Sequence, residues 1–107
     1  MRKMAFSFIL SREQMAMSKA KLYKTDGTIL EVVPANGTDF QLDELQAMVG
    51  GYIEIVPAGK GKIMVIDDEG KLKGKPFNEA ATMMFMQAGY YDTIVCDALV
   101  CDSEMVQ

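Results

Sequence analysis

Two pairs of short β-prone segments, each joined by a turn of hairpin length, constrain the fold most strongly. The first pair, 21–25 and 28–33, is separated by Asp26-Gly27, the dipeptide that most favours a two-residue hairpin turn. The second pair, 52–56 and 62–66, is separated by a short loop that contains two glycines. Connections this short join antiparallel neighbours, because parallel strands need a crossover of a dozen residues or more. The pattern therefore predicts an antiparallel or mixed sheet.

Two helical segments alternate with these strands. The first runs from a cap at Thr38 or Asp39 to Gly50-Gly51, and the second runs from a cap at Asn78 to Gly89. Apolar spacing predicts one buried face on the first helix, made of Leu42, Leu45, Met48 and Val49. Between the helices, 67–70 is predicted as a tight turn with Gly70 left-handed and 71–75 as extended chain. A last β-prone stretch, 93–96 and 98–101, completes the order ββαββαβ, which predicts a small α+β domain with two helices on the sheet.

The first 18 residues differ from this regular pattern, and we expect residues 19–107 to form a single domain. The extension is either an added arm or an over-extended start, with translation beginning at Met15 or Met17. No apolar run approaches the roughly 18 residues of a membrane span, and no signal-peptide cleavage site follows the short run 4–10. With only Cys96 and Cys101, the chain is expected to be a cytoplasmic protein with free thiols.

The absence of histidine removes the commonest general base and the commonest metal ligand. Two cysteines without histidine do not complete a four-ligand zinc site. The sequence also lacks a phosphate-binding G-x-x-x-x-G-K-[ST] loop, a complete G-x-G-x-x-G and a G-x-S-x-G nucleophile motif. We therefore expect a protein that is not an enzyme and that uses no metal or cofactor.

Charge is distributed unevenly along a chain whose net charge is −4. This acidity makes nucleic acid an unlikely partner, because phosphate contacts dominate such binding. Five lysines nevertheless gather within sixteen residues among four glycines: Lys60, Lys62, Lys71, Lys73 and Lys75. Glycine lets backbone amides converge and lysine adds a point charge, so the segment is a candidate site for a small anion. The alternative is that these lysines only solubilise hairpin tips and protect a sheet edge. Side chains that can read a base or ribose in such a ligand are Asn78, Tyr52 and Tyr90.

The second helix is apolar nearly all round, because it contains the run Met83, Met84, Phe85 and Met86. A surface helix normally has a polar face. A chain this short has little with which to enclose the spare face, so we expect a homo-oligomer that buries these four residues.

Three segments carry a family resemblance: L-D-E-L-Q-A-M-V-G-G-Y-I-E-I-V at 42–56, K-I-M-V-I-D-D-E-G-K-L-K-G-K-P-F-N at 62–78, and D-T-I-V-C-D-A-L-V at 92–100. Through them, residues 20–102 resemble an uncharacterised domain family found mainly in short proteins of phages, prophages and other mobile elements. The chain departs from the family at Cys96, where glycine is usual, and in its first 17 residues. The resemblance implies a biological setting and no catalytic set.

Two functions follow as hypotheses. The first is a phage anti-defence protein that sequesters a small phosphate-bearing nucleotide signal, such as a cyclic nucleotide or a cyclic ADP-ribose-like molecule, with the lysines on phosphate. The second is a protein–protein inhibitor or regulator of a host defence protein, in which the acidic segments 25–59 and 76–107 cover a basic surface.

Overall fold

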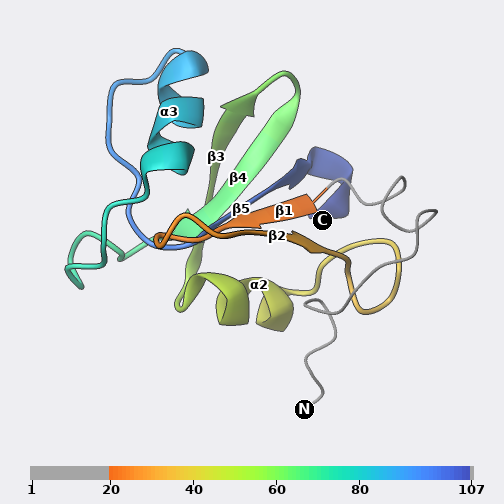
Figure 1. Ribbon diagram of the computed structural model, residues 1–107. Helices are drawn as coiled ribbons and strands as arrows, with labels where there is room; N and C mark the ends of the chain where they lie inside the picture. The colour runs from red at the N-terminus through yellow and green to blue at the C-terminus, as the bar shows by residue number, and fades with distance from the viewer. Residues whose placement is uncertain (1–19, 107) are drawn as a thin grey trace.

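The protein is described by a computed structural model over residues 20–106. The five strands of these described residues form one sheet in which every neighbouring pair is antiparallel (Figure 1). The strands are β1 (Ala20–Tyr23), β2 (Ile29–Val32), β3 (Ile53–Gly59), β4 (Lys62–Asp67) and β5 (Ala98–Asp102). Their order across the sheet is β2-β1-β5-β4-β3. The last strand of the sequence thus lies in the centre, between the two hairpins.

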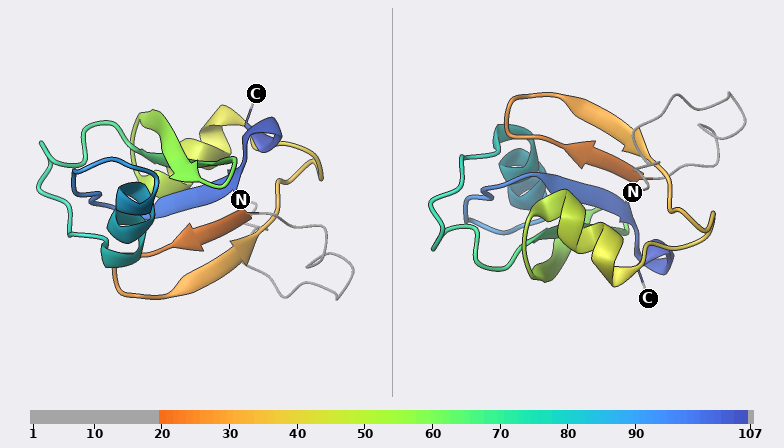
Figure 2. Two further views of the ribbon diagram at one scale, coloured as in Figure 1. Left: turned by 90° about the horizontal axis from the view of Figure 1, so that it is seen from above. Right: turned by 90° about the horizontal axis from the view of Figure 1, so that it is seen from below.

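The helices α2 (Leu42–Val49) and α3 (Glu79–Gln87) cover opposite faces of this sheet (Figure 1). Viewed from below, α2 lies across β5 (Figure 2, right). A 3-10 turn, η2 (Ser103–Met105), follows β5. The expected α+β class, with an antiparallel sheet and two helices, is confirmed. Along the chain the described elements follow one another as β1, β2, α2, β3, β4, α3, β5 and η2, whereas across the sheet the strands are interleaved, with β5 in the centre.

Each face of the sheet has its own apolar core. Under α2, side chains of β1, β4 and β5 pack with the buried helix residues Leu45, Met48 and Val49. Under α3, Met64, Ile66, Ala98 and Val100 of the sheet pack with Ala81, Met84 and Phe85. These two cores fix the positions of the helices, and therefore of the loops that enter and leave them. None of the helices among residues 20–106 is long and apolar enough to cross a membrane.

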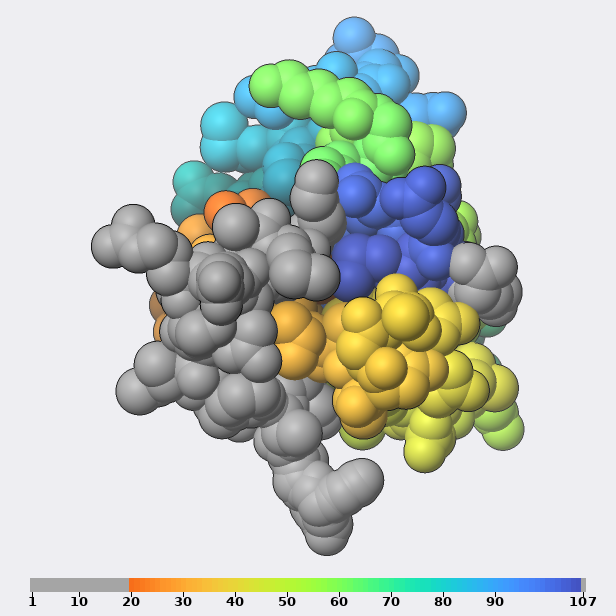
Figure 3. All heavy atoms as spheres, turned by 90° about the vertical axis from the view of Figure 1, so that its right-hand side faces the viewer, coloured from red at the N-terminus to blue at the C-terminus, as the bar shows by residue number. Residues whose placement is uncertain are grey.

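The C-terminal end of the described chain is tied to the segment that leads into α2. The amide of Phe40 donates to the carbonyl of Met105 at 2.8 Å, and Phe40 forms a parallel bridge with Val106. In the space-filling view, the end of β5 and η2 (blue) lie between the β3–β4 hairpin (green) and this segment (yellow) (Figure 3). The contact closes the α2 face of the sheet at this end.

Two helix and turn boundaries differ from the sequence prediction. The first helix is capped at Gln41, where the Glu44 carboxylate accepts the Gln41 amide at 2.8 Å. Thr38 and Asp39 are held outside the helix because the Asn36 side chain accepts both of their amides. Leu42, predicted to be core, is 57% exposed. The β1–β2 turn spans three residues, since Lys24 and Thr28 close it by a backbone hydrogen bond of 2.9 Å.

The predictions for the loops on either side of α3 were also wrong in detail. Residues 71–75 are a chain of turns instead of extended backbone, with Lys75 N–H donating to the carbonyl of Gly70 at 3.0 Å. Gly70 does not have a positive φ, and a Cβ there would lie 3.0 Å from Val95 Cγ2, so close packing favours glycine at this position. Residues 93–96 form only an isolated bridge between Val95 and Phe77. The final strand is β5 alone.

Cys96 has a φ of 77°, in the left-handed region that favours glycine. Glycine adopts this conformation without a Cβ penalty, whereas a residue with a side chain does not. We predict that Cys96→Gly is more stable than Cys96→Ala by about 1 kcal/mol, because both lose the sulfur and only alanine retains the Cβ penalty. Urea unfolding of the two variants measures this difference. At most other sites alanine is the more stable of the two, so alanine in the lead here would contradict the conformational argument.

Candidate functional site

The structure separates the five candidate lysines into two groups. Lys60 and Lys62 lie at the β3–β4 hairpin turn, whereas Lys71, Lys73 and Lys75 follow the opposite end of β4. A six-residue strand spans roughly 17 Å at the usual rise per residue, so one small anion does not reach both groups. The eight predicted site residues therefore do not form a single site.

Ion pairs within the domain already engage most of these lysines. Lys62 Nζ lies 2.7 Å from Asp102 Oδ1, and Lys71 Nζ lies 2.6 Å from Asp92 Oδ1. The Lys71 pair lowers the pKa of Asp92. Lys60 is exposed in the two-residue turn between β3 and β4, where it has a φ of 56°.

Lys73 and Lys75 form a cluster around the buried side chain of Asp67, the last residue of β4. Lys73 Nζ lies 3.0 Å from Asp67 Oδ2, and Lys75 Nζ contacts the same oxygen. Lys75 Nζ also donates to the carbonyls of Val49 at 2.9 Å and Gly50 at 3.1 Å. These carbonyls belong to the end of α2, where cations are favourable because the helix dipole is negative there. The two lysines thus fasten the 67–75 loop to α2.

Gly50 and Gly51 leave the space that this cluster needs. A Cβ on Gly51 would lie 2.5 Å from Lys73 Nζ and 2.7 Å from Asp67 Oδ1. The Asp67 side chain has no solvent exposure. Burial opposes its ionisation, but hydrogen bonds from Lys75, the Glu69 amide and Lys73 outweigh burial and lower the pKa of Asp67 to about 2. This geometry gives the cluster a structural role, which is to hold the 67–75 loop against the end of α2.

The three residues that were predicted to recognise a base or ribose lie apart from one another. Asn78 is 1% exposed and uses its side chain internally, because it accepts the Ala81 amide and donates to the carbonyls of Tyr23 and Cys96. Tyr52 is exposed just before β3. The Tyr90 ring stacks on Phe85 with centroids 4.9 Å apart. The cap at Asn78 is confirmed, and its polar atoms are occupied.

The methionine-rich helix has one packed face and one open face. Met84 and Phe85 are half-buried against the sheet, whereas Met83 and Met86 are 54% and 47% exposed. The expected homo-oligomer interface is therefore reduced to two exposed methionines, and self-association stays a prediction.

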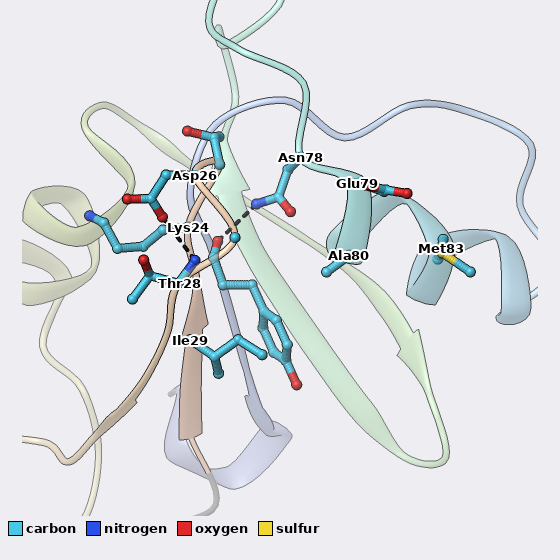
Figure 4. Close-up of a pocket in the computed structure, with 11 residues that line it drawn as sticks. Lys24, Asp26, Thr28, Ile29, Asn78, Glu79, Ala80 and Met83 are labelled. Carbon is cyan, nitrogen blue, oxygen red and sulfur yellow. Dashed lines mark hydrogen bonds between the residues drawn. The ribbon is translucent and has the colours of Figure 1, made fainter.

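A cleft of about 370 Å³ lies between the β1–β2 hairpin and the start of α3. Ile29 lies on one side of the cleft, with Ala80 and Met83 on the other (Figure 4). Asp26 and Glu79 add carboxylates to its lining. Among the described residues of the lining, Lys24 is the one lysine, and it is ion-paired with Asp97 at 3.2 Å. The cleft combines an apolar wall with a negative rim.

A second, smaller cleft of about 160 Å³ borders α3 at Phe85. Its acidic lining includes Glu54, Asp68 and Asp92. The helix α3 is thus bordered by two clefts lined in part by carboxylates. Among the described residues, no three His, Cys, Asp or Glu side chains are grouped so that they could hold a metal ion.

Residues that line the first cleft were not among the predicted site residues, apart from Asn78. Their sequence signals are ordinary: Asp26 lies in a turn, Ile29 in a strand and Met83 in an apolar run. Only the tertiary fold brings the β1–β2 hairpin beside α3. The observable hint was the excess of apolar residues on the second helix.

The fold and the clefts define a small α+β domain in which two clefts lined in part by carboxylates border α3. The chain belongs to the family described as "Domain of unknown function (DUF3846)", whose profile matches residues 21–105. No curated protein and no solved structure matches the chain.

Proposed function

We propose that this protein is a non-enzymatic binding protein that covers a basic surface of a partner protein with the acidic surface around α3. The observation that carries the proposal is the charge of the described domain. Residues 20–106 contain seven lysines and fourteen Asp and Glu residues, a formal charge of −7. Five of the seven lysines are engaged in ion pairs inside the domain. A basic partner is steered towards such a surface, and polyanions are repelled.

The resemblance to short phage and mobile-element proteins supports a more specific role. On this basis the partner is a host defence protein, and the protein acts as an anti-defence inhibitor or regulator. Two buried, free cysteines support a location in the host cytoplasm, since a reducing compartment keeps thiols unpaired. Burial raises the pKa of Cys101 to about 11, so this thiol has little reactive thiolate.

Sequestration of a small phosphate-bearing nucleotide, such as a cyclic nucleotide or a cyclic ADP-ribose-like molecule, is the second candidate function. It is favoured by the size of the first cleft, which is within the range of small-molecule sites, and by Tyr23 in its lining. We rank it second because Asp26 and Glu79 oppose phosphate and because Lys24 is already paired.

Affinity capture with charge-matched variants tests the leading proposal. The variant Glu54→Gln/Glu79→Gln removes one exposed carboxylate from each of the two clefts that border α3, and Asp43→Asn/Glu104→Gln removes two exposed carboxylates elsewhere. Each immobilised protein is incubated with lysate of the cells that carry the gene, and bound proteins are eluted with a salt gradient and quantified by mass spectrometry.

The expected result is a captured basic protein that elutes at moderate salt. Retention of this basic protein by Glu54→Gln/Glu79→Gln should fall about fivefold, because charge close to the interface contributes most. Retention by the control variant Asp43→Asn/Glu104→Gln should fall less than about twofold. Capture that is insensitive to salt, or equal for the two variants, would contradict the proposed acidic surface.

A further inference from the structure

In the described part of the chain, apolar side chains on both sides of the first cleft are exposed. Ile29, on an outer strand of the sheet, is 53% exposed, and Met83 on α3 is 54% exposed. Tyr23, half-buried and paired with Ile29 in the β1–β2 register, contributes to the same lining. Removing such apolar surface from water is favourable, so an apolar group of a partner gains affinity here.

Carboxylates at the ends of the same cleft set its charge preference. The Asp26 carboxylate accepts the Thr28 amide at 2.8 Å, which lowers its pKa and fixes its position beside the β1–β2 turn. Glu79 is the first residue of α3 and is exposed. Since Lys24 is neutralised by Asp97, the lining carries a net negative charge.

We propose that this cleft is a docking site for a partner segment in which an apolar side chain is flanked by Lys or Arg residues. The inference rests on the proposed function and gives it a location and a recognition pattern. The apolar side chain enters between Ile29 and Met83, and the flanking cations lie near Asp26 and Glu79. Charge brings the segment to the protein, and the apolar wall selects which residue lies between the charges.

Two blocked pentapeptides are the probes. Lys-Arg-Leu-Arg-Lys carries the full pattern, and Lys-Arg-Ser-Arg-Lys keeps the charges but lacks the apolar side chain. Affinities are measured by calorimetry at low salt, and the contact is located from amide shifts in two-dimensional NMR spectra. The leucine peptide should bind about tenfold more tightly, since burial of one such side chain is worth at least that factor. Its shifts should centre on Ile29, Ala80 and Met83.

Matched double variants separate the cleft from general stickiness. Ile29→Thr/Met83→Gln removes apolar groups from the cleft without changing charge. Ile55→Thr/Met86→Gln makes the same changes at an exposed β3 position and at an exposed α3 position, neither of which lines the cleft. The first variant should abolish the preference for leucine, and the second should retain it. Thermal melts by circular dichroism check that both are folded.

The outcomes distinguish this inference from the proposed function. Equal affinity for the two peptides, together with salt-sensitive capture of a basic protein, would overturn the cleft assignment alone. Weak binding of both peptides and salt-insensitive capture would overturn both. A dimer detected by sedimentation that Ile29→Thr/Met83→Gln dissociates would assign the cleft to a second copy of the chain and would overturn the inference.

Discussion

Replacing Asp67 by alanine is expected to lower the free energy of unfolding by about 3 kcal/mol, one of the two largest effects of a single polar substitution here. The substitution removes a fully buried carboxylate that holds Lys73, Lys75 and the Glu69 amide together. The two lysines that fasten the 67–75 loop to the end of α2 then lose their carboxylate partner. Urea unfolding measures the loss, and Asp68→Ala is the matched control, since Asp68 is the exposed neighbour and should change stability by less than about 0.5 kcal/mol.

Acid provides an independent check on this cluster. The pKa of Asp67 is about 2 in the folded protein and 3.8 when unperturbed, so the folded state holds the proton less tightly. The carboxylate therefore contributes stability above pH 4, about 2 kcal/mol at neutral pH, and this contribution is lost as the pH falls from 4 towards 2. The advantage of the wild type over Asp67→Asn should shrink across that range. An advantage that is constant with pH would show that the charge of Asp67 has no stabilising role.

Asn78→Ala is also expected to lower the free energy of unfolding by about 3 kcal/mol. The change removes the cap of α3, worth about 1 kcal/mol, and leaves the carbonyls of Tyr23 and Cys96 without their side-chain donor. Asn36→Ala is the control, because Asn36 also accepts backbone amides but lies in an exposed loop. A stable Asn78→Ala protein that has lost affinity for a nucleotide would instead support the reading role predicted from the sequence.

Features that depend on neighbouring residues were predictable from the sequence. Alternating apolar residues and glycine-containing turns identify both hairpins, and Asn78 followed by an apolar run identifies α3. The central place of β5 was not predictable, because it depends on pairing with β1 and β4, which are distant in sequence. The conformation of Cys96 likewise depends on packing around a position that sequence patterns read as strand.

The candidate site shows the same limit more sharply. A run of lysines and glycines has the composition of an anion site, but Lys75 is 26 residues from Val49, the carbonyl of which it binds. The partners of these lysines are set by the tertiary fold, and they convert an expected ligand site into a structural cluster. Conversely, the first cleft joins the β1–β2 turn to α3 across about 50 residues of chain, and no local motif marks it.

The proposed function and the position of the lysines are linked. Residues 20–106 contain fourteen Asp and Glu residues but only seven lysines, and five of these lysines are held in ion pairs, so the surface presents carboxylates in excess. A small polyanion meets repulsion at both clefts beside α3, whereas a basic protein surface meets complementary charge. The chemical class of the bound partner therefore decides between the two proposed functions.

Native mass spectrometry tests this claim most directly. The protein is analysed as isolated from the cells that carry the gene, and again after incubation with a panel of cyclic nucleotides and ADP-ribose derivatives. The account predicts a complex with a basic protein that dissociates as salt is raised, and no nucleotide adduct. A nucleotide retained at unchanged mass, with no protein partner, would contradict it and would support sequestration of a small signal.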